Sequence, residues 1–284
     1  AFRAEGKGQQ RILVSKELLL RDGVILVDRP NPDDRQDVLR LTQTHLEQVN
    51  NNVNFRAVVE HLQSTTYLHL VPQLLKHADG ISGRLLENDP FGQGLLQRIA
   101  KTTVKTRDAR LRRIQQVLAQ AVPQFSELRF LQDPISGTPH LEACYQHWRP
   151  HGAWQREDQF SDGTLRLIGL LWALQDGDGL LLLEEPELSL NDAIVSHIPL
   201  MVDRVLRKRS ASARQVIIST HSDMLLSDVS EAACVLLLQP SANGTLVRPP
   251  THEESSLIAN GLSVSEVLLP KTRIQNADQL GLFA

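Results

Sequence analysis

The sequence is poor in cysteine and in long apolar runs, and each shortage excludes a class of protein. Its 284 residues include two cysteines, Cys144 and Cys234, too few for a disulfide scaffold and suited to a reducing cytosol. The most apolar stretch, 165–183, is cut by Asp176 and Asp178 and falls short of a membrane span. No secretory signal opens the sequence, so we expect a cytoplasmic protein without membrane contact.

Neither sign of charge dominates the composition. The chain has 30 lysines and arginines against 33 aspartates and glutamates, a net charge of −3. A nearly neutral chain has no global reason to bind nucleic acid, so any such site must be a local basic patch. The 41% of hydrophobic residues and the length allow one large domain or two ordinary ones.

The first half of the chain has strand-like and then helix-like patterns. Residues 11–28 predict two β-strands with a hairpin turn at Asp22-Gly23. Between Asp37 and Ala121 the apolar residues recur mostly at helical spacing, and residues 97–121 predict a single long helix. We therefore expect a β-rich segment followed by a helical one.

The segment 163–238 alternates helices and strands with short connections. We expect helices at 164–175, 191–209 and 222–228, and strands at 180–184, 214–219 and 234–238. The strands around Leu182 and Ile217 are almost wholly apolar, which predicts parallel, central strands covered on both faces. The expected fold is α/β, with a mostly parallel sheet and flanking helices. The expected segments are a β-lobe remnant (1–30), a helical insertion (31–127), an α/β lobe (128–260) and a tail (261–284).

Two adjacent carboxylates follow the first apolar strand. The carboxyl ends of parallel strands form the ligand-binding edge of α/β proteins. Glu184 can hold a hydrated Mg²⁺ on a nucleotide, and Glu185 can orient or deprotonate an attacking water. Pro186 then stops the strand. The alternative is an acidic helix start, in which glutamate stabilises the N-terminal dipole.

Two further segments carry the same kind of chemistry. His221 ends the next strand, where it can hydrogen-bond a γ-phosphate or serve as an ordinary loop histidine. Upstream, Ser161-Asp162-Gly163-Thr164 precedes an apolar helix. A serine or aspartate caps such a helix, a glycine lets backbone approach a ligand, and the free N–H groups attract phosphate. The alternative is a well-capped buried helix.

In this order and spacing the three segments resemble the ABC-type ATPases of the RecF, SMC and OLD group, often grouped with the AAA-family ATPases. Ser161 to Thr164 resembles the signature motif, Leu180 to Glu185 the Walker B motif with the catalytic glutamate, Glu187 to Asn191 the D-loop, and His221 the switch histidine. Glu184 stands where aspartate is usual. The resemblance covers residues 154–240 closely and implies a P-loop NTPase fold of the ABC-head type.

The resemblance implies an enzyme that hydrolyses ATP, with ATP and Mg²⁺ as cofactors. In that group each ATP lies between two heads, so an ATP-gated homodimer is implied. The implied catalytic residues are Glu185 and His221, the metal residue is Glu184, and the nucleotide-binding residues are Ser161, Asp162, Gly163, Thr164, Arg166 and Asn191. The implied setting is DNA maintenance or anti-phage defence. The alternative is a catalytically incomplete scaffold or regulatory subunit that assembles with a separate effector, such as a nuclease.

The sequence lacks the P-loop, Gly-x-x-x-x-Gly-Lys-[Ser/Thr], that cradles phosphates in these enzymes. Gly6-Lys7 is followed by Gly8 instead of serine or threonine. Because the chain begins with Ala1 and not with methionine, we expect a fragment whose P-loop segment lies elsewhere, and which is inactive alone. A degenerate ATPase that never had a P-loop is the alternative.

Three weaker patterns concern partners and metals. A basic stripe can contact DNA or simply face solvent: Arg98, Lys101, Lys105, Arg107, Arg110, Arg112 and Arg113. The last residues resemble a motif that binds the bacterial sliding clamp, or a hydrophobic end docked on its own domain: Gln279, Leu280, Leu282 and Phe283. A third group matches no zinc template, so we expect no metal there: His140, Glu142, Cys144, His147 and His151.

Overall fold

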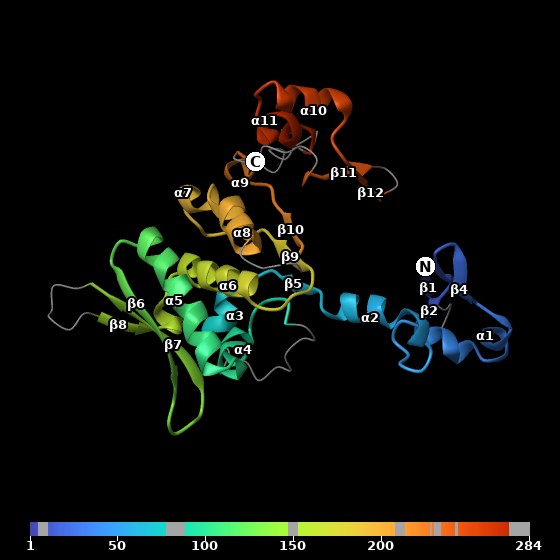
Figure 1. Ribbon diagram of the computed structural model, residues 1–284, viewed down its shortest axis with the longest axis horizontal. Coiled ribbons are helices and arrows are strands. Elements are labelled where there is room, and N and C mark those ends of the chain that lie inside the picture. The colour runs from blue at the N-terminus through green and yellow to red at the C-terminus, as the bar shows by residue number, and fades with distance from the viewer. Residues whose placement is uncertain are drawn as a thin grey trace, which may run out of the picture. The chain divides into compact units, whose positions relative to one another are not determined.

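The chain forms two compact units, Ala1–Thr65 and Thr66–Ala284. A computed structural model describes residues 1–4, 11–77, 89–146, 153–207, 214–227, 229, 234–241 and 244–272 (Figure 1). Outside these ranges lie the pair Gly6-Lys7, the histidines His147 and His151, and residues 279–283, which resemble a clamp-binding motif. Each unit is described separately below.

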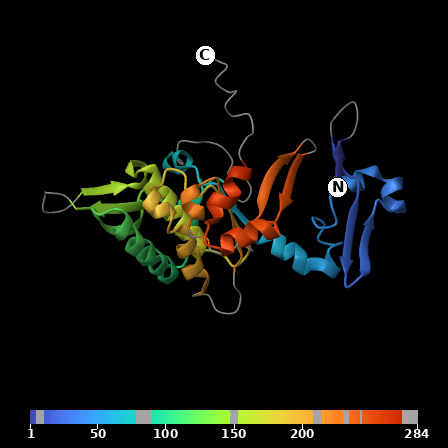
Figure 2. The ribbon, with the colours of Figure 1, turned by 90° about the horizontal axis from the view of Figure 1, so that it is seen from above.

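The first unit is built from two antiparallel strand pairs and short helices. Its elements are β1 (Phe2–Ala4), β2 (Ile12–Val14), β3 (Glu17–Arg21), β4 (Val24–Arg29), α1 (Pro32–Gln36) and α2 (Arg56–Gln63), with 3-10 turns at Val38–Thr42 and Val53–Phe55. Strand β1 pairs with β2, and β3 pairs with β4 (Figure 2). The predicted hairpin turn is confirmed, since Asp22 and Gly23 have φ values of 52° and 80°.

An ion network lies inside the first unit. The guanidinium of Arg29, 1% exposed, donates to Asp34 over 3.0 and 2.8 Å and to Glu17 over 3.0 Å. It also donates to the backbone carbonyl oxygens of Arg40 and Gln43. Hydrogen bonds from Arg29 lower the pKa of the Asp34 carboxyl to about 2. The buried charges are therefore fully paired.

The second unit contains a parallel sheet of three described strands. Its order is β10 (Val216–Ser219), β9 (Leu181–Glu184), β5 (Thr66–Leu68), and β9 is central. The predicted parallel pairing is confirmed. The prediction that both apolar strands are covered on both faces is wrong for β10, where Ile217 is 49% exposed. Among the described strands, β10 pairs on one side only, with β9. Composition alone does not reveal this, because it depends on which strands lie beside β10.

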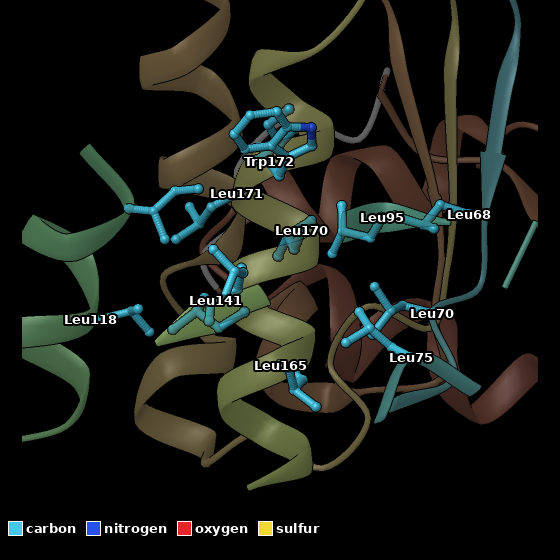
Figure 3. Packing of buried hydrophobic residues seen from close by; sticks show 14 of the residues in the cluster. Leu68, Leu70, Leu75, Leu95, Leu118, Leu141, Leu165, Leu170, Leu171 and Trp172 are labelled. Carbon is cyan, nitrogen blue, oxygen red and sulfur yellow. The ribbon is translucent and has the colours of Figure 1, made fainter. Parts of the chain in front are cut away.

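Helix α6 (Asp162–Gln175) forms the centre of the core. Its apolar residues cover its whole circumference, the pattern of a helix buried on all sides. Figure 3 shows Leu170 of α6 facing Leu68 and Leu95, while Leu118 and Leu141 lie on the other side of the helix. Residues from β5 to β9 thus share one hydrophobic cluster.

The predicted single helix over 97–121 is wrong, because it consists of α4 (Leu95–Lys101) and α5 (Val104–Ala121). Thr102 takes extended backbone angles, which end α4, and Thr103 precedes α5. Helix α5 packs on an antiparallel sheet of β6 (Phe125–Gln132), β7 (Pro139–Tyr145) and β8 (Ala153–Arg156), in that order. Because of this break, the residues of the basic stripe lie on two helices instead of one.

The remaining elements complete the second unit. They are α3 (Pro72–Lys76), α7 (Asp192–Val195), α8 (Ile198–Arg207), α9 (Asp223–Leu226), β11 (Leu237–Ser241), β12 (Gly244–Arg248), α10 (His252–Ala259) and α11 (Val264–Leu268), with 3-10 turns at Glu157–Gln159 and Leu269–Lys271. The predicted helix 191–209 is therefore two helices. The segment expected to be a tail contains α11, whose Val264 and Leu268 are buried with Leu237 and Ile258 in a second hydrophobic cluster.

Candidate functional site

An acidic turn follows the central strand β9. Glu184 is the last residue of β9 and lies opposite Ser219 of β10. The backbone N–H of Glu185 donates to the Ser219 carbonyl oxygen over 3.0 Å, and Glu185 has a φ of 42°. A left-handed conformation is uncommon for a residue with a side chain, and it persists only where surrounding structure imposes it. The sheet and buried Pro186 thus fix the direction in which the two carboxylates leave the strand.

Tyr67 of β5 supports the first of these carboxylates. Its hydroxyl donates a hydrogen bond to Glu184 Oε2, and this bond raises the pKa of Tyr67. Glu184 also lines a small recess with Arg166 of α6 and an apolar wall formed by Leu68, Leu70, Leu170, Leu183 and Pro186. Sequence reasoning missed Tyr67 because it precedes Glu184 by 117 residues.

The structure brings Glu185 and His221 together, as their predicted positions at neighbouring strand ends require. His221 Nε2 lies 4.0 Å from Glu185 Oε1, and the His221 side chain is 83% exposed. Beside them, the Thr220 hydroxyl donates to Glu187 Oε1. The loops that follow β9 and β10 are therefore linked by side chains, and His221 remains open to a ligand.

The segment that resembles a signature motif caps helix α6. Ser161 is the N-cap, and its hydroxyl accepts from the Thr164 N–H over 3.1 Å. Asp162 is held by α3, since Lys76 Nζ donates to it over 2.8 Å and Gln73 Nε2 over 2.6 Å. The hydrogen bond from Lys76 is the main cause of its lowered pKa. Asp162 thus joins α3 to the start of α6.

Gly163 lies directly against the loop that resembles a D-loop. A Cβ atom at this position would approach the backbone oxygen of Ser189 to 2.6 Å. Ser189 itself has a φ of 61°, and Asn191 caps α7 by accepting from the Ala193 N–H over 3.0 Å. The two motifs are therefore in contact, and only glycine fits at their junction.

We expect Gly163→Ala to push the 187–191 loop away and to lower the free energy of unfolding by about 1–3 kcal/mol. The new methyl group meets backbone, which cannot rotate aside. Gly169→Ala, on the same helix, should also lose stability, because its Cβ atom would come within 2.2 Å of Leu70 Cδ1, but it should leave the 187–191 loop in place. Urea denaturation of both variants measures the difference. A Gly163→Ala variant as stable as wild type would disprove the close contact.

Arg166 interacts electrostatically with acids of its own chain. It lines the recess beside Glu184, and the charges of Asp162, Glu185 and Glu187 act to raise the pKa of its guanidinium. Burial lowers the pKa of its guanidinium, and its buried Nε has no hydrogen-bond partner among the described residues. The start of α6 and the acidic turn are thus electrostatically coupled within one chain.

The donor set at the acidic turn fits Mg²⁺ bound with a nucleotide. Within the described ranges no group of three histidine, cysteine, aspartate or glutamate side chains is arranged to hold a metal ion. Mg²⁺ in nucleotide sites commonly takes one or two carboxylates and completes its shell with phosphate oxygens and water. Glu184, with one oxygen bound to Tyr67, offers such a carboxylate.

The basic stripe is smaller than its sequence suggests. Arg98 pairs with Asp89 at 3.2 Å, Arg110 pairs with Asp176 at 2.7 Å, and Arg107 stacks on Phe130 at 4.1 Å. The exposed basic residues of the stripe are Lys101, Lys105, Arg112 and Arg113. Fewer charges are therefore available for phosphates.

The side chains that superficially resembled metal ligands have other partners. His140 Nδ1 lies 2.7 Å from Glu157 Oε1. Glu142 pairs with Arg129 at 2.7 Å and with Arg156 at 3.4 Å.

Every helix in the described part of the chain is too short or too polar to cross a bilayer.

The fold has weak similarity to solved heads of SMC proteins. One chain, from a study titled "Structural biochemistry of ATP-driven dimerization and DNA stimulated activation of SMC ATPases", is 18% identical, with 55% of this chain and 92% of that chain covered and a TM-score of 0.40. An Smc head with an extended coiled coil, bound to the C-terminal domain of ScpA from Pyrococcus furiosus, is 19% identical over 55% of this chain and 38% of its own, with a TM-score of 0.41. An SmcHead bound to the C-winged helix domain of ScpA is 17% identical over 68% and 57%, with a TM-score of 0.42.

No curated protein matches the sequence. A family of P-loop ATPase domains, in contrast, matches residues 5–228, which is well over half of the chain. The match spans the parallel sheet, α6, the acidic turn and His221, and it confirms the predicted α/β P-loop NTPase fold. The chain therefore belongs to the AAA domain family described as "AAA domain, putative AbiEii toxin, Type IV TA system".

Proposed function

We propose that this chain is part of an ABC-type ATPase head of the RecF, SMC and OLD group, which hydrolyses ATP between two heads. The observation that carries the proposal is the convergence of Glu184, Glu185 and His221 at one edge of the parallel sheet. Ligands of open α/β sheets bind at this edge. Membership of an ATPase family supports the same reaction.

Each side chain at this edge has a proposed role in ATP hydrolysis. Glu185, a third exposed, accepts the proton of the attacking water or orients that water. Glu184 holds the hydration shell of Mg²⁺, which when bound neutralises charge on the phosphates. His221, exposed and 4.0 Å from Glu185, donates a hydrogen bond to the γ-phosphate. The three residues thus surround the position of the terminal phosphate.

The start of α6 is proposed to serve the nucleotide of the opposite head. Helix N-termini carry unsatisfied N–H groups and attract phosphate. Gly163 presents backbone at this start, Ser161 supplies a hydroxyl and caps the N–H of buried Thr164, and Asp162 orients the segment through Lys76. Arg166 and Asn191 belong to the same region, as the lining of the recess and the cap of α7.

The biological setting is proposed from the family description, and a contact with DNA from the exposed basic residues. The family description names a toxin of a toxin–antitoxin system, which favours a cytoplasmic role in anti-phage defence over DNA maintenance. DNA contact would use the exposed Lys101, Lys105, Arg112 and Arg113. Residues 279–283 are proposed to bind the sliding clamp. A clamp pull-down with and without Phe283 tests this.

The full-length protein should bind ATP and dimerise when ATP is present. Sedimentation velocity at millimolar nucleotide measures this, with ADP and nucleotide-free protein as the comparison. We expect dimers with ATP and monomers in both other samples, because the γ-phosphate joins the two heads. The contrary result, no nucleotide binding at millimolar ATP, would favour a scaffold that assembles with a separate effector.

A further inference from the structure

We propose that Tyr67 positions Glu184 for Mg²⁺ by holding one of its two carboxylate oxygens. This inference rests on the proposed function, in which Glu184 is the metal residue. The Tyr67 hydroxyl occupies Oε2 and leaves Oε1 for the metal or its water shell. Tyr67 is a positioning residue, since it acts through Glu184.

The pairing of two strands far apart in the sequence creates this contact. Strand β5 pairs with β9 in parallel, with Tyr67 opposite Leu182 and Leu68 opposite Leu183. Glu184 is two residues beyond Leu182, so its side chain leaves the same face of the sheet. Tyrosine is long enough to bridge to this diagonal neighbour, and its hydroxyl reaches Glu184 Oε2. A shorter hydroxyl residue at position 67 would not reach.

The chemistry of Glu184 makes such a support useful. Glutamate has one more rotatable bond than the aspartate usual at this position of the resembled group, so its carboxylate has more orientations to lose on binding a metal. A hydrogen bond from a phenol to a carboxylate is charge-assisted and restricts that freedom before the metal arrives. Partners of this kind orient metal-binding carboxylates in many proteins. Tyr67 therefore offsets the longer side chain.

The lining of the recess beside Glu184 also favours a supporting role for Tyr67. Its walls are largely apolar, with Leu68, Leu183 and Pro186 beside the carboxylate. Arg166 also lines the recess, but the hydrogen bond that Glu184 Oε2 accepts comes from Tyr67.

The test measures Mn²⁺ binding to the full-length protein in the presence of ADP by electron paramagnetic resonance. Tyr67→Phe removes only the hydroxyl, and we expect the Kd for Mn²⁺ to rise about 10-fold, the typical cost of losing a support to a metal ligand. ADP affinity in EDTA should stay unchanged, because the metal then takes no part. Tyr145→Phe is the comparison, because Tyr145 on β7 is the chain's other tyrosine and its hydroxyl hydrogen-bonds Thr164 instead of Glu184.

Glu184→Gln separates this inference from the proposed function. Weaker Mn²⁺ binding in both Glu184→Gln and Tyr67→Phe supports the inference. Weaker binding in Glu184→Gln with wild-type binding in Tyr67→Phe overturns the role of Tyr67 alone. Unchanged binding in Glu184→Gln overturns the metal assignment, and the role of Tyr67 with it. Equal losses in Tyr67→Phe and Tyr145→Phe would also overturn a specific role.

Discussion

Glu185→Gln in the full-length protein should lower the rate of ATP hydrolysis by about 10²–10⁴-fold, the range attributed to a positioned general base. The amide has the shape of the carboxylate but cannot accept a proton from water. The backbone of Glu185, whose N–H donates to Ser219, is unaffected by the exchange, so the turn and its φ of 42° should persist. Phosphate release under single-turnover conditions measures the effect.

The same variant should still close with ATP, because binding and chemistry use different groups. We expect Glu185→Gln to accumulate as an ATP-bound dimer in sedimentation velocity, since it binds ATP and cannot complete the cycle. Glu253→Gln, an exposed glutamate at the start of α10, is the matched control and should hydrolyse ATP at the wild-type rate. Normal hydrolysis by Glu185→Gln would show that another group activates the water.

The neighbourhood of the site could be predicted where it depends on local patterns. The apolar circumference of α6, the cap at Ser161 and the acids that follow Leu183 are visible in short windows of sequence, and the structure has each in place. The proximity of Glu185 and His221 followed from one inference, that two apolar strands are parallel neighbours. These features need no knowledge of distant parts of the chain.

The contacts that refine the site depend on distant parts of the chain. Tyr67 meets Glu184 only because β5 pairs with β9, and Lys76 meets Asp162 across a similar separation. The basic stripe has fewer exposed charges than its sequence suggests for the same reason. Arg110 lies one helical turn from exposed Arg113, yet Asp176, at the end of α6, pairs with it at 2.7 Å. A pattern of charges along one helix does not show which partners other elements bring.

The first unit should depend on Arg29 more than on any apolar residue. Among its described residues, its two hydrophobic clusters contain three buried residues each, so it has little core. Arg29→Met keeps the length of the side chain but removes the buried cation that pairs with Glu17, and it leaves Asp34 with only the exposed Arg40 at 3.6 Å. Removing one partner of a buried ion network costs about 3–5 kcal/mol. Hydrogen exchange of the β3–β4 amides measures this loss, and Arg21→Met, whose side chain is 71% exposed, is the matched control with little expected effect.

The pH dependence of that loss tests the cause. In the wild type the pKa of Asp34 is lowered from 3.8 to about 2, so the stabilisation is present above about pH 4 and disappears as the pH falls through 2. In Arg29→Met the hydrogen bonds from Arg29 are lost, while Arg40 at 3.6 Å and the Asn31 N–H still act to lower the pKa of Asp34. The pKa of Asp34 should therefore be lowered less than in the wild type, so the variant has less of this stabilisation to lose. The difference in protection between wild type and variant should be largest above about pH 4 and should shrink as the pH falls toward 2. A difference that is the same at pH 7 and at pH 2 would show that Arg29 acts through packing, because packing does not titrate.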